Sequence, residues 1–233
     1  MKIVFFSDAH GNQYAVDSFF EDVQTVGYDK VIFGGDVFGY YYEPDQILSR
    51  LREEHVHCLL GNHDRMFLDL VEGKISENFL IERYGNSYKN IVERISMENI
   101  DFLYSLKSIY DMEVDGLKLA FVHGALDDEL NGRIYPDTVI KDTEKYKGIN
   151  FVFTGHTHHK MVKILDNGCS IINGGSIGQQ RDGRGCSYAV FDTIGQTYHF
   201  RVCEYPVDKL LRDIDMREDE DRMKEKLGEV LLR

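Results

Sequence analysis

Short apolar runs alternate with helical periodicities over the first sixty residues of the chain. The runs Ile3–Phe6, Val31–Phe33 and Val56–Leu60 are rich in β-branched and aromatic residues, as is typical of buried strands. Between these runs, apolar side chains recur at the spacing of a helix face, at Val16, Phe19, Phe20 and Val23 and, after Pro44, at Ile47, Leu48 and Leu51. Strands that alternate with helices predict parallel βαβ units in this part of the chain.

The middle of the chain, residues 64–107, has a mainly helical pattern. Its expected core positions are the apolar residues Phe79, Leu80, Tyr84, Ile91, Ile95, Phe102, Leu103 and Leu106. After Ser108 the pattern changes to that of strands. Ile109–Val114 and Leu117–Val122 flank Asp115-Gly116, a dipeptide that is typical of a β-hairpin turn.

Later apolar runs predict further strands, at Phe151–Thr154, Met161–Leu165, Ser170–Ile172, Tyr188–Phe191 and Thr197–Val202. From Val207 onward a charged segment is helical in pattern, with Leu210, Leu211 and Ile214 on one face. No linker, repeat or low-complexity stretch separates these elements, so residues 1–233 are expected to form a single domain. The order of elements predicts two sheets, one from each half of the chain, packed together and flanked by helices.

Polar residues directly follow the first three predicted strands. Asp8 and His10 follow the first strand, Asp36 the second, and Asn62 and His63 the third. Parallel strands place their carboxyl ends at one edge of the sheet, which is where open α/β sheets bind ligands. Asp8 and His10 are two residues apart, so in extended backbone their side chains would point the same way. Glycines beside most of these residues allow sharp turns and close backbone approach.

The second half of the chain supplies histidines at equivalent places. His123 follows the strand Leu117–Val122, and His156 and His158 follow Phe151–Thr154. A lone histidine of this kind is more often structural, but here the whole set stands at strand ends. Carboxylates, an amide and imidazoles without any thiolate form a ligand set suited to Mn, Fe, Zn, Co or Ni.

Five short segments resemble the signature blocks of the calcineurin-like metallophosphoesterases. In chain order they are Asp8-Ala9-His10, Gly35-Asp36, Gly61-Asn62-His63-Asp64, Val122-His123-Gly124 and Gly155-His156-Thr157-His158. Residues 173–179, followed by Arg181-Asp182, are similar to a block of the small bacterial and archaeal phosphodiesterase branch. One block alone would be weak evidence, whereas five blocks in the family's order are specific. The resemblance implies a four-layer α/β/β/α sandwich of two mixed sheets flanked by helices.

The resemblance also implies a dinuclear metal centre. One divalent cation would be bound by Asp8, His10, Asp36 and His158, and the second by Asp36, Asn62, His123 and His156. Two such ions, ~3.5–4 Å apart, repel each other and need anions between them, which the shared carboxylate of Asp36 would help to provide. With both aspartates and a hydroxide present, one positive charge remains for a phosphate diester. Mn is the expected metal, with Fe, Zn, Ni or Co as alternatives.

The expected reaction is hydrolysis of a phosphate ester by a hydroxide that bridges the two ions. His63 follows a ligand, so it is expected to protonate the leaving-group oxygen or to stabilise charge on it, with Asp64 orienting its ring. Tyr40 is a candidate platform for an aromatic group of the substrate; the alternative for residues 40–42 is packing against loops or a subunit interface. Arg181 is a candidate phosphate contact. The expected substrate is a small nucleotide-type diester or a dinucleoside polyphosphate.

Composition limits the kinds of partner that the protein is expected to bind and the cell compartment in which it is expected. The formal net charge of −13 argues against an extended nucleic-acid duplex, which basic surfaces bind, but not against a small phosphate substrate. No apolar run approaches the ~20 residues of a membrane-spanning helix, and the first run is too short for a signal peptide. The wide spacing of Cys58, Cys169, Cys186 and Cys203 favours reduced structural thiols. The chain is therefore expected to be cytoplasmic, without a membrane partner, and a homo-oligomer is left open.

Two other functions are compatible with the same resemblance. A phosphomonoesterase of the protein Ser/Thr phosphatase type is disfavoured, because such enzymes have Asp-Arg-Gly after the Gly-Asp block and Glu after Asn-His. This chain instead has Phe38-Gly39-Tyr40 and Asp64 at those places. A non-catalytic scaffold of the same fold would be expected to have lost ligands or the equivalent of His63, and all of them are present in the sequence.

Overall fold

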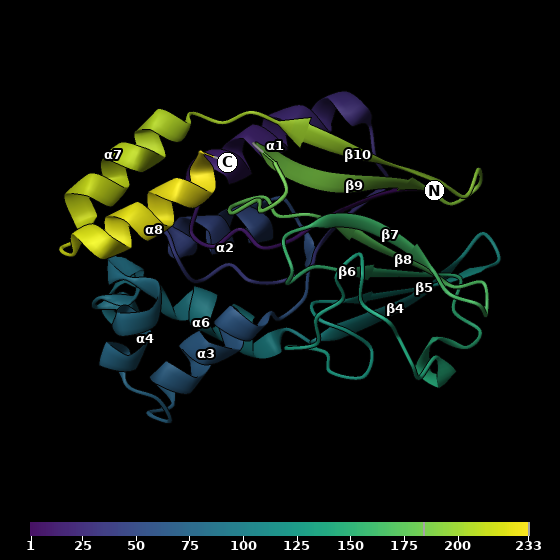
Figure 1. Cartoon of the computed structure of the whole chain (residues 1–233), viewed down its shortest axis with the longest axis horizontal. Coiled ribbons are helices and arrows are strands. Elements are labelled where there is room, and N and C mark those ends of the chain that lie inside the picture. Colours follow the sequence, from purple (N-terminus) through teal and green to yellow (C-terminus); the bar gives the residue numbers. More distant parts are fainter. Residues whose placement is uncertain (184, 233) are drawn as a thin grey trace.

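The computed structural model describes residues 1–183 and 185–232, which fold around two five-stranded sheets (Figure 1). The strand order of the first sheet is β10-β9-β1-β2-β3. Its strands are β1 (Lys2–Phe6), β2 (Lys30–Phe33), β3 (His57–Cys58), β9 (Cys186–Asp192) and β10 (Thr197–Cys203). The first three strands run parallel, as the βαβ pattern predicts, whereas β9 is antiparallel to both β1 and β10.

The second sheet has the strand order β4-β5-β6-β8-β7. Its strands are β4 (Ile109–Val114), β5 (Leu117–Val122), β6 (Phe151–Thr154), β7 (Lys160–Ile164) and β8 (Ser170–Gly174). The hairpin predicted around Asp115-Gly116 joins β4 to β5, and β5, β6 and β8 are parallel. Both sheets are therefore mixed, and the fold class predicted from the sequence is confirmed.

The expectation that each half of the chain forms its own sheet is wrong. Strands β9 and β10 belong to the second half by sequence, yet they extend the first sheet beside β1. Strand β9 is buried along nearly its whole length, so it needs a partner on each side and a cover on each face. Apolar periodicity identifies such a strand but does not say which neighbour it pairs with.

Helices cover the outer face of the first sheet. The helices that pack in one core with this face are α1 (Gln13–Val26), α2 (Pro44–Glu53), α3 (Asn62–Val71), α4 (Glu77–Tyr84), α5 (Ile91–Arg94) and α6 (Met97–Ser105). Helices α7 (Val207–Arg217) and α8 (Asp221–Leu231) pack against Tyr41 and Tyr42 instead. The side chain of Asn12 caps α1 by accepting a hydrogen bond from the backbone N–H of Ala15 at 3.1 Å, and Pro44 occupies the first turn of α2. The outer face of the second sheet packs against residues 125–149, which include the 3-10 turn Glu144–Tyr146.

The two sheets pack through aromatic side chains. Alternation along β1 sends Ile3 and Phe5 into the space between the sheets, while Val4 and Phe6 face the helices. The ring of Phe5 lies 5.9 Å from that of Phe121 and 5.6 Å from that of Phe153, both in the second sheet. This apolar interface fixes the two sheets relative to each other, and with them the polar residues at the strand ends.

Of the core positions predicted in residues 64–107, one is wrong. Phe79 is 43% exposed, whereas its neighbour Leu80 is fully buried. Successive residues on a helix point about 100° apart, so only one of this pair can face the core. The ring of Phe79 instead lies 5.0 Å from the guanidinium of Arg83 on the helix surface. Tyr84, Phe102 and Leu106 are half-buried, and the other predicted positions are buried.

A disulfide joins Cys186 to Cys203, so the expectation of free thiols is wrong for this pair. The two residues are direct partners across β9 and β10, with Cα atoms 5.3 Å apart, a separation suited to a disulfide. Their juxtaposition depends on strand register and is invisible in their spacing along the chain. Cys58 and Cys169 are free and buried. Among the described residues, no helix is both long enough and apolar enough to cross a lipid bilayer.

Candidate metal centre

Loops at the ends of five strands meet between the two sheets. The loop after β1 is hydrogen-bonded to the loop after β2, from Asp8 N–H to Gly35 O at 2.9 Å and from His10 N–H to Asp36 O at 3.0 Å. The loop after β6 meets both sheets: Gly155 N–H donates to His123 O at 2.9 Å, and His156 N–H donates to the Asp8 carboxylate. The seven predicted ligands therefore converge in one place, as the strand-end pattern indicates.

Five of these ligands adopt left-handed backbone conformations. The φ angles are +59° for Asp8, +49° for His10, +65° for Asp36, +64° for His156 and +61° for His158. Such angles are uncommon outside glycine, and they persist only where the surrounding structure imposes them, characteristically at functional sites. The extended backbone expected for Asp8 and His10 is therefore wrong, although their side chains do converge.

Close backbone approach at two glycines makes this convergence possible. A β-carbon on Gly61 would collide with the carboxylate of Asp36, and one on Gly155 would collide with the side chain of Ser7. Any other residue at these positions would push apart the loops that carry the ligands.

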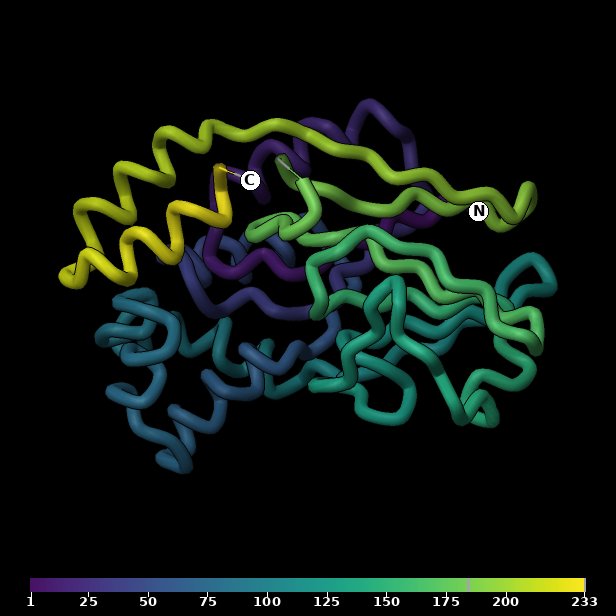
Figure 2. Tube along the Cα trace, in the orientation of Figure 1, coloured from purple at the N-terminus to yellow at the C-terminus, as the bar shows by residue number. Residues whose placement is uncertain are grey.

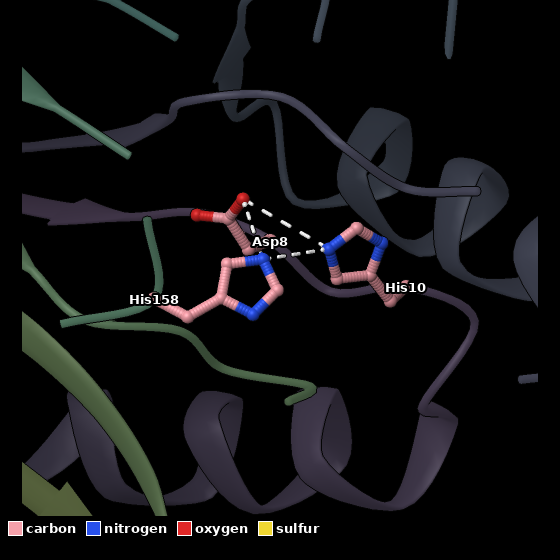
Figure 3. Close-up of side chains that lie close together, drawn as sticks. All are labelled: Asp8, His10 and His158. Atoms are coloured by element: carbon pink, nitrogen blue, oxygen red, sulfur yellow. Dashed lines mark hydrogen bonds and ion pairs between the residues drawn. The ribbon is translucent and has the colours of Figure 1, made fainter. Parts of the chain in front are cut away.

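Asp8, His10 and His158 form the first group of donors, shown in Figure 3. The Nε2 atoms of His10 and His158 are 3.0 Å apart. Asp8 Oδ1 lies 3.4 Å from His158 Nε2 and 3.9 Å from His10 Nε2. All three side chains are almost completely buried, so three strong donor groups point at one small volume.

Asp36, His123 and His156 form the second group. His123 Nε2 lies 3.3 Å from Asp36 Oδ2, 3.2 Å from His156 Nδ1 and 3.0 Å from Asn62 Oδ1. The same Asp36 Oδ2 is 3.8 Å from His10 Nε2 in the first group. One carboxylate oxygen thus stands between the two groups, which is the position that a shared ligand requires.

Backbone carbonyls fix the tautomers of three histidines. Nδ1 of His10 lies 2.6 Å from Phe38 O, Nδ1 of His158 lies 2.7 Å from Gln179 O, and Nδ1 of His123 lies 2.9 Å from Gly34 O. A carbonyl oxygen only accepts hydrogen bonds, so each Nδ1 carries the proton. In its neutral form each ring directs its Nε2 lone pair inward, toward other lone pairs and carboxylates. Such an arrangement repels itself unless cations lie among the donors, and it therefore fits divalent metal ions.

The pKa values of the carboxyl and imidazole groups in the centre also fit a site for cations. Burial opposes ionisation of Asp8 and Asp36, but neighbouring imidazoles, chiefly His158 for Asp8 and His123 for Asp36, bring both carboxyl pKa values below their usual range. Burial also works against the charged form of His123, yet Asp36 raises the pKa of His123 to about 9. Both aspartates are therefore anions at neutral pH, and their surroundings favour positive charge beside them.

His63 lies at the edge of the centre, and its partner differs from the one expected. His63 Nδ1 is 3.2 Å from the hydroxyl oxygen of Tyr88, and burial lowers the His63 pKa to about 4. The carboxylate of Asp64 instead accepts backbone N–H groups from Asp36, Val37 and Gly61 at 2.8–2.9 Å. Asp64 thus joins two loops that carry predicted ligands, and the side-chain contact with the His63 ring that was expected of Asp64 is made by Tyr88 instead.

The candidate substrate residues lie beside the predicted ligands. The ring of Tyr40 is 4.7 Å from that of His10, and the Arg181 guanidinium donates to the Tyr40 hydroxyl at 3.4 Å. Tyr40 has a φ of +44°, so its backbone is strained in the same way as that of the ligands. Tyr41 and Tyr42 are buried against α7 and α8, so the packing alternative holds for these two residues.

Three residues in contact with the site were not predicted. Tyr88 holds the His63 ring, Tyr84 places its ring 4.6 Å from that of His63, and Arg133 Nε–H donates to His156 Nε2 at 3.0 Å. Tyr84 and Tyr88 lie in the helical region, where an aromatic residue is more often part of the core. Arg133 lies in the long segment after β5, and nothing in its local sequence marks it.

Comparisons with known proteins agree with this geometry. Residues 1–196 match the calcineurin-like phosphoesterase superfamily domain. An uncharacterized protein of Methanocaldococcus jannaschii is 30% identical over 250 aligned positions, which cover 98% of this chain and 96% of the relative.

Two solved structures share the fold over nearly the whole chain. A metallophosphoesterase from Sphaerobacter thermophilus has a TM-score of 0.76 at 23% identity and covers 98% of both chains. A hypothetical protein from Pyrococcus horikoshii also has a TM-score of 0.76, at 16% identity, and covers 99% of this chain and 97% of its own. With two groups of buried donors at the ends of the strands and a family match over residues 1–196, this chain belongs to the calcineurin-like phosphoesterase superfamily, whose members are dinuclear metal-dependent hydrolases.

Proposed function

We propose that this protein is a dinuclear-metal phosphodiesterase that hydrolyses a small nucleotide-type substrate or a dinucleoside polyphosphate. The observation that carries the proposal is the placement of Asp36, whose Oδ2 lies 3.8 Å from His10 Nε2 and 3.3 Å from His123 Nε2. A carboxylate in this position can serve two cations at once, and the family is one of metal-dependent hydrolases.

Two sets of residues would hold the cations, Asp8, His10, Asp36 and His158 on one side and Asp36, Asn62, His123 and His156 on the other. When bound, such a pair supplies an activated water molecule as the nucleophile and withdraws charge from the phosphate. Imidazole and carboxylate donors together suit Mn, which we propose as the metal, ahead of Fe, Zn, Ni and Co.

His63 would act on the leaving group. Its Nδ1 lies 3.2 Å from the Tyr88 hydroxyl, which fixes the ring and leaves Nε2 to act on the departing oxygen, either by donating a proton to it or by a hydrogen bond that stabilises its charge. The rings of Tyr84 and Tyr40, 4.6 and 5.4 Å from that of His63, restrict its movement and exclude water from one side of it.

The net charge of the proposed metal centre favours a phosphate diester over a phosphate monoester as the substrate. Asp8 and Asp36 are the only carboxylates among the proposed ligands, so two divalent cations and a hydroxide nucleophile leave a single positive charge. A phosphate diester carries one negative charge and balances it. The scaffold alternative gains no support from the geometry, because the complete ligand set and His63 converge.

The experiment is hydrolysis of bis(p-nitrophenyl) phosphate, p-nitrophenyl phosphate and diadenosine tetraphosphate by purified protein with each candidate metal. We expect Mn²⁺ to support turnover of the diester in preference to the monoester. EDTA should abolish the activity, and fresh metal should restore it. Preference for the monoester would make the protein a phosphomonoesterase. Absence of turnover with all five metals would favour the scaffold.

A further inference from the structure

Three cationic side chains from separate elements gather beside the metal centre. Arg83 lies in the last turn of α4, Arg181 in the loop between β8 and β9, and Lys226 in α8. The Lys226 ammonium donates to the backbone carbonyl of Arg83 at 2.8 Å, which ties α8 to the end of α4. The trace in Figure 2 shows the C-terminal helices folding back over residues 77–90, far away in sequence.

Short contacts connect these cations to the residues of the centre. The backbone N–H of Arg181 donates to the carbonyl of the ligand His158 at 3.2 Å, and its side chain reaches the Tyr40 hydroxyl. The Arg83 guanidinium lies 5.0 Å from the Phe79 ring and also hydrogen-bonds to the side chain of Tyr84. The ring of Tyr84 is 4.6 Å from that of His63 and 5.7 Å from that of Tyr40. Tyr40 and Tyr84 therefore stand between the proposed ligands and the cations.

These three cations lack the carboxylate partners that their neighbours have. In the C-terminal helices, Lys224 pairs with Asp215 at 3.0 Å and Arg217 pairs with Glu43 at 2.6 Å. Within residues 1–183 and 185–232, no carboxylate forms an ion pair with Arg83, Arg181 or Lys226. The cations are placed to attract an anion from outside the chain.

Mutual repulsion among the cations supports this interpretation. The pKa of Lys226 is lowered, first by partial loss of hydration of its ammonium and then by the positive charges of Arg222, Arg181 and Arg83. A protein with a net charge of −13 has many carboxylates with which to neutralise such a group, yet none of those in the described part of the chain forms an ion pair with Lys226. An anion bound among the cations would relieve the repulsion.

We propose that Arg83, Arg181 and Lys226 form a second anion site that binds the phosphate groups of the substrate that are not hydrolysed. Guanidinium groups bind phosphate oxygens in pairs, and an ammonium adds a point charge, so together they suit a chain of phosphates. This inference rests on the proposed function and narrows it: the substrate carries two or more linked phosphates, as a dinucleoside polyphosphate does. One phosphate would react at the metal centre, and the others would lie between Tyr40, Tyr84 and the cations.

The first test measures binding alone. Inorganic tripolyphosphate is titrated calorimetrically into metal-free protein, for the wild type and the variants Arg83→Gln, Lys226→Gln and Lys224→Gln. Each of the first two substitutions should raise the Kd about tenfold, as expected for loss of a charge-assisted hydrogen bond. Lys224→Gln removes a neighbouring charge from the same helix and should change the Kd less than about twofold. Equal effects of Lys224→Gln and Lys226→Gln, or no effect of either proposed residue, would overturn the site.

The second test measures selectivity. The quantity is the ratio of kcat/KM for diadenosine tetraphosphate to kcat/KM for bis(p-nitrophenyl) phosphate. Arg83→Gln and Lys226→Gln should each lower this ratio about tenfold, while Lys226→Arg, which keeps the charge, should retain most of it. Both side chains are exposed, so these variants are expected to fold.

The outcomes separate this inference from the function on which it rests. If neither substrate is turned over with any metal, the phosphodiesterase function fails. If the diester is turned over but the ratio is the same in the wild type, Arg83→Gln and Lys226→Gln, only the anion site fails.

Discussion

The space between the two sheets is apolar at one end and densely polar at the other. At the apolar end, Phe191 is fully buried, with its ring 4.5 Å from that of Phe151. At the polar end, Asp8 and His10 are equally buried, but both have positive φ angles and face other hydrogen-bond acceptors. Burial therefore stabilises the fold at one end and opposes it at the other. Packing at the apolar end holds the backbone of the polar end in its strained conformation. We expect substitutions at the apolar end to change stability and substitutions at the polar end to change catalysis.

The largest expected effect is on catalysis at the polar end. His63→Ala should lower kcat roughly 10²–10⁴-fold while the protein keeps its metal, because His63 is proposed to move a proton and not to bind a cation. The measurement is steady-state kinetics together with elemental analysis of the same sample. Loss of metal in His63→Ala would instead make this residue a ligand, which its place beside His10 and Asp36 would permit.

Tyr88→Phe tests whether catalysis depends on the orientation of the His63 ring. It removes only the hydroxyl 3.2 Å from His63 Nδ1. We expect a smaller loss of kcat, greatest for esters with poor leaving groups, because those need the proton most. A loss that is the same for all leaving groups would indicate a purely structural role for Tyr88.

The next effect is on stability at the apolar end. Phe191→Ala should lower the free energy of unfolding by about 3–5 kcal/mol, the usual range for a large buried ring. Phe191 pairs with Ile3 near the start of β1, whereas the ligands follow its end, so the folded variant should keep its metal affinity and kcat. Chemical denaturation and kinetics at low temperature measure both quantities. A large fall in kcat of the folded protein would show that the two ends are coupled.

The smallest effect tests an ordinary ion pair outside this space. The Arg201 guanidinium donates to both oxygens of Asp22 at 3.0 and 2.6 Å, and this hydrogen bonding lowers the Asp22 pKa against the opposing effect of burial. Asp22→Asn should lower the free energy of unfolding by about 1 kcal/mol at pH 7.

The pH dependence of this loss has a definite sign. A carboxyl group whose pKa is lowered on folding contributes stability above its unfolded value of 3.8, and that contribution disappears as the pH falls through the folded value. The difference between wild type and Asp22→Asn, measured by denaturation, should therefore shrink toward zero at acidic pH. The exposed Asp101→Asn serves as the control, with little effect at either pH. A difference that grew on acidification would contradict the assignment.

The sequence predicts the residues at the polar end of the inter-sheet space better than it predicts which strands pair to enclose that space. Asp8, Asp36 and His123 were predicted because each follows an apolar run, and parallel strands bring such positions to one edge. The location of β9 beside β1 and the disulfide between Cys186 and Cys203 were missed, because both depend on pairing between distant segments. Local periodicity does not specify strand partners.

Within the site, the structure brings the predicted ligands together, but some of the contacts around them differ from those expected. Asp64 was expected to orient His63 because the two are adjacent in sequence, but on α3 adjacent side chains diverge, and Asp64 turns to the backbone of Val37 and Gly61. Tyr88, 25 residues away, reaches the ring instead. A candidate ligand can be identified in the sequence by its residue type. A contact that supports it depends on how distant segments pack, which the sequence does not show.

The central claim is that two cations share the carboxylate of Asp36, and metal stoichiometry tests it most directly. Metal-free wild type and Asp36→Asn are dialysed against Mn²⁺ and analysed for bound metal, with circular dichroism to verify that both are folded. We predict two Mn²⁺ per wild-type chain and loss of both tightly bound ions in Asp36→Asn, because each ion loses an anionic ligand and the repulsion between them is no longer offset. Two ions retained by folded Asp36→Asn, or none bound by the wild type, would contradict the account.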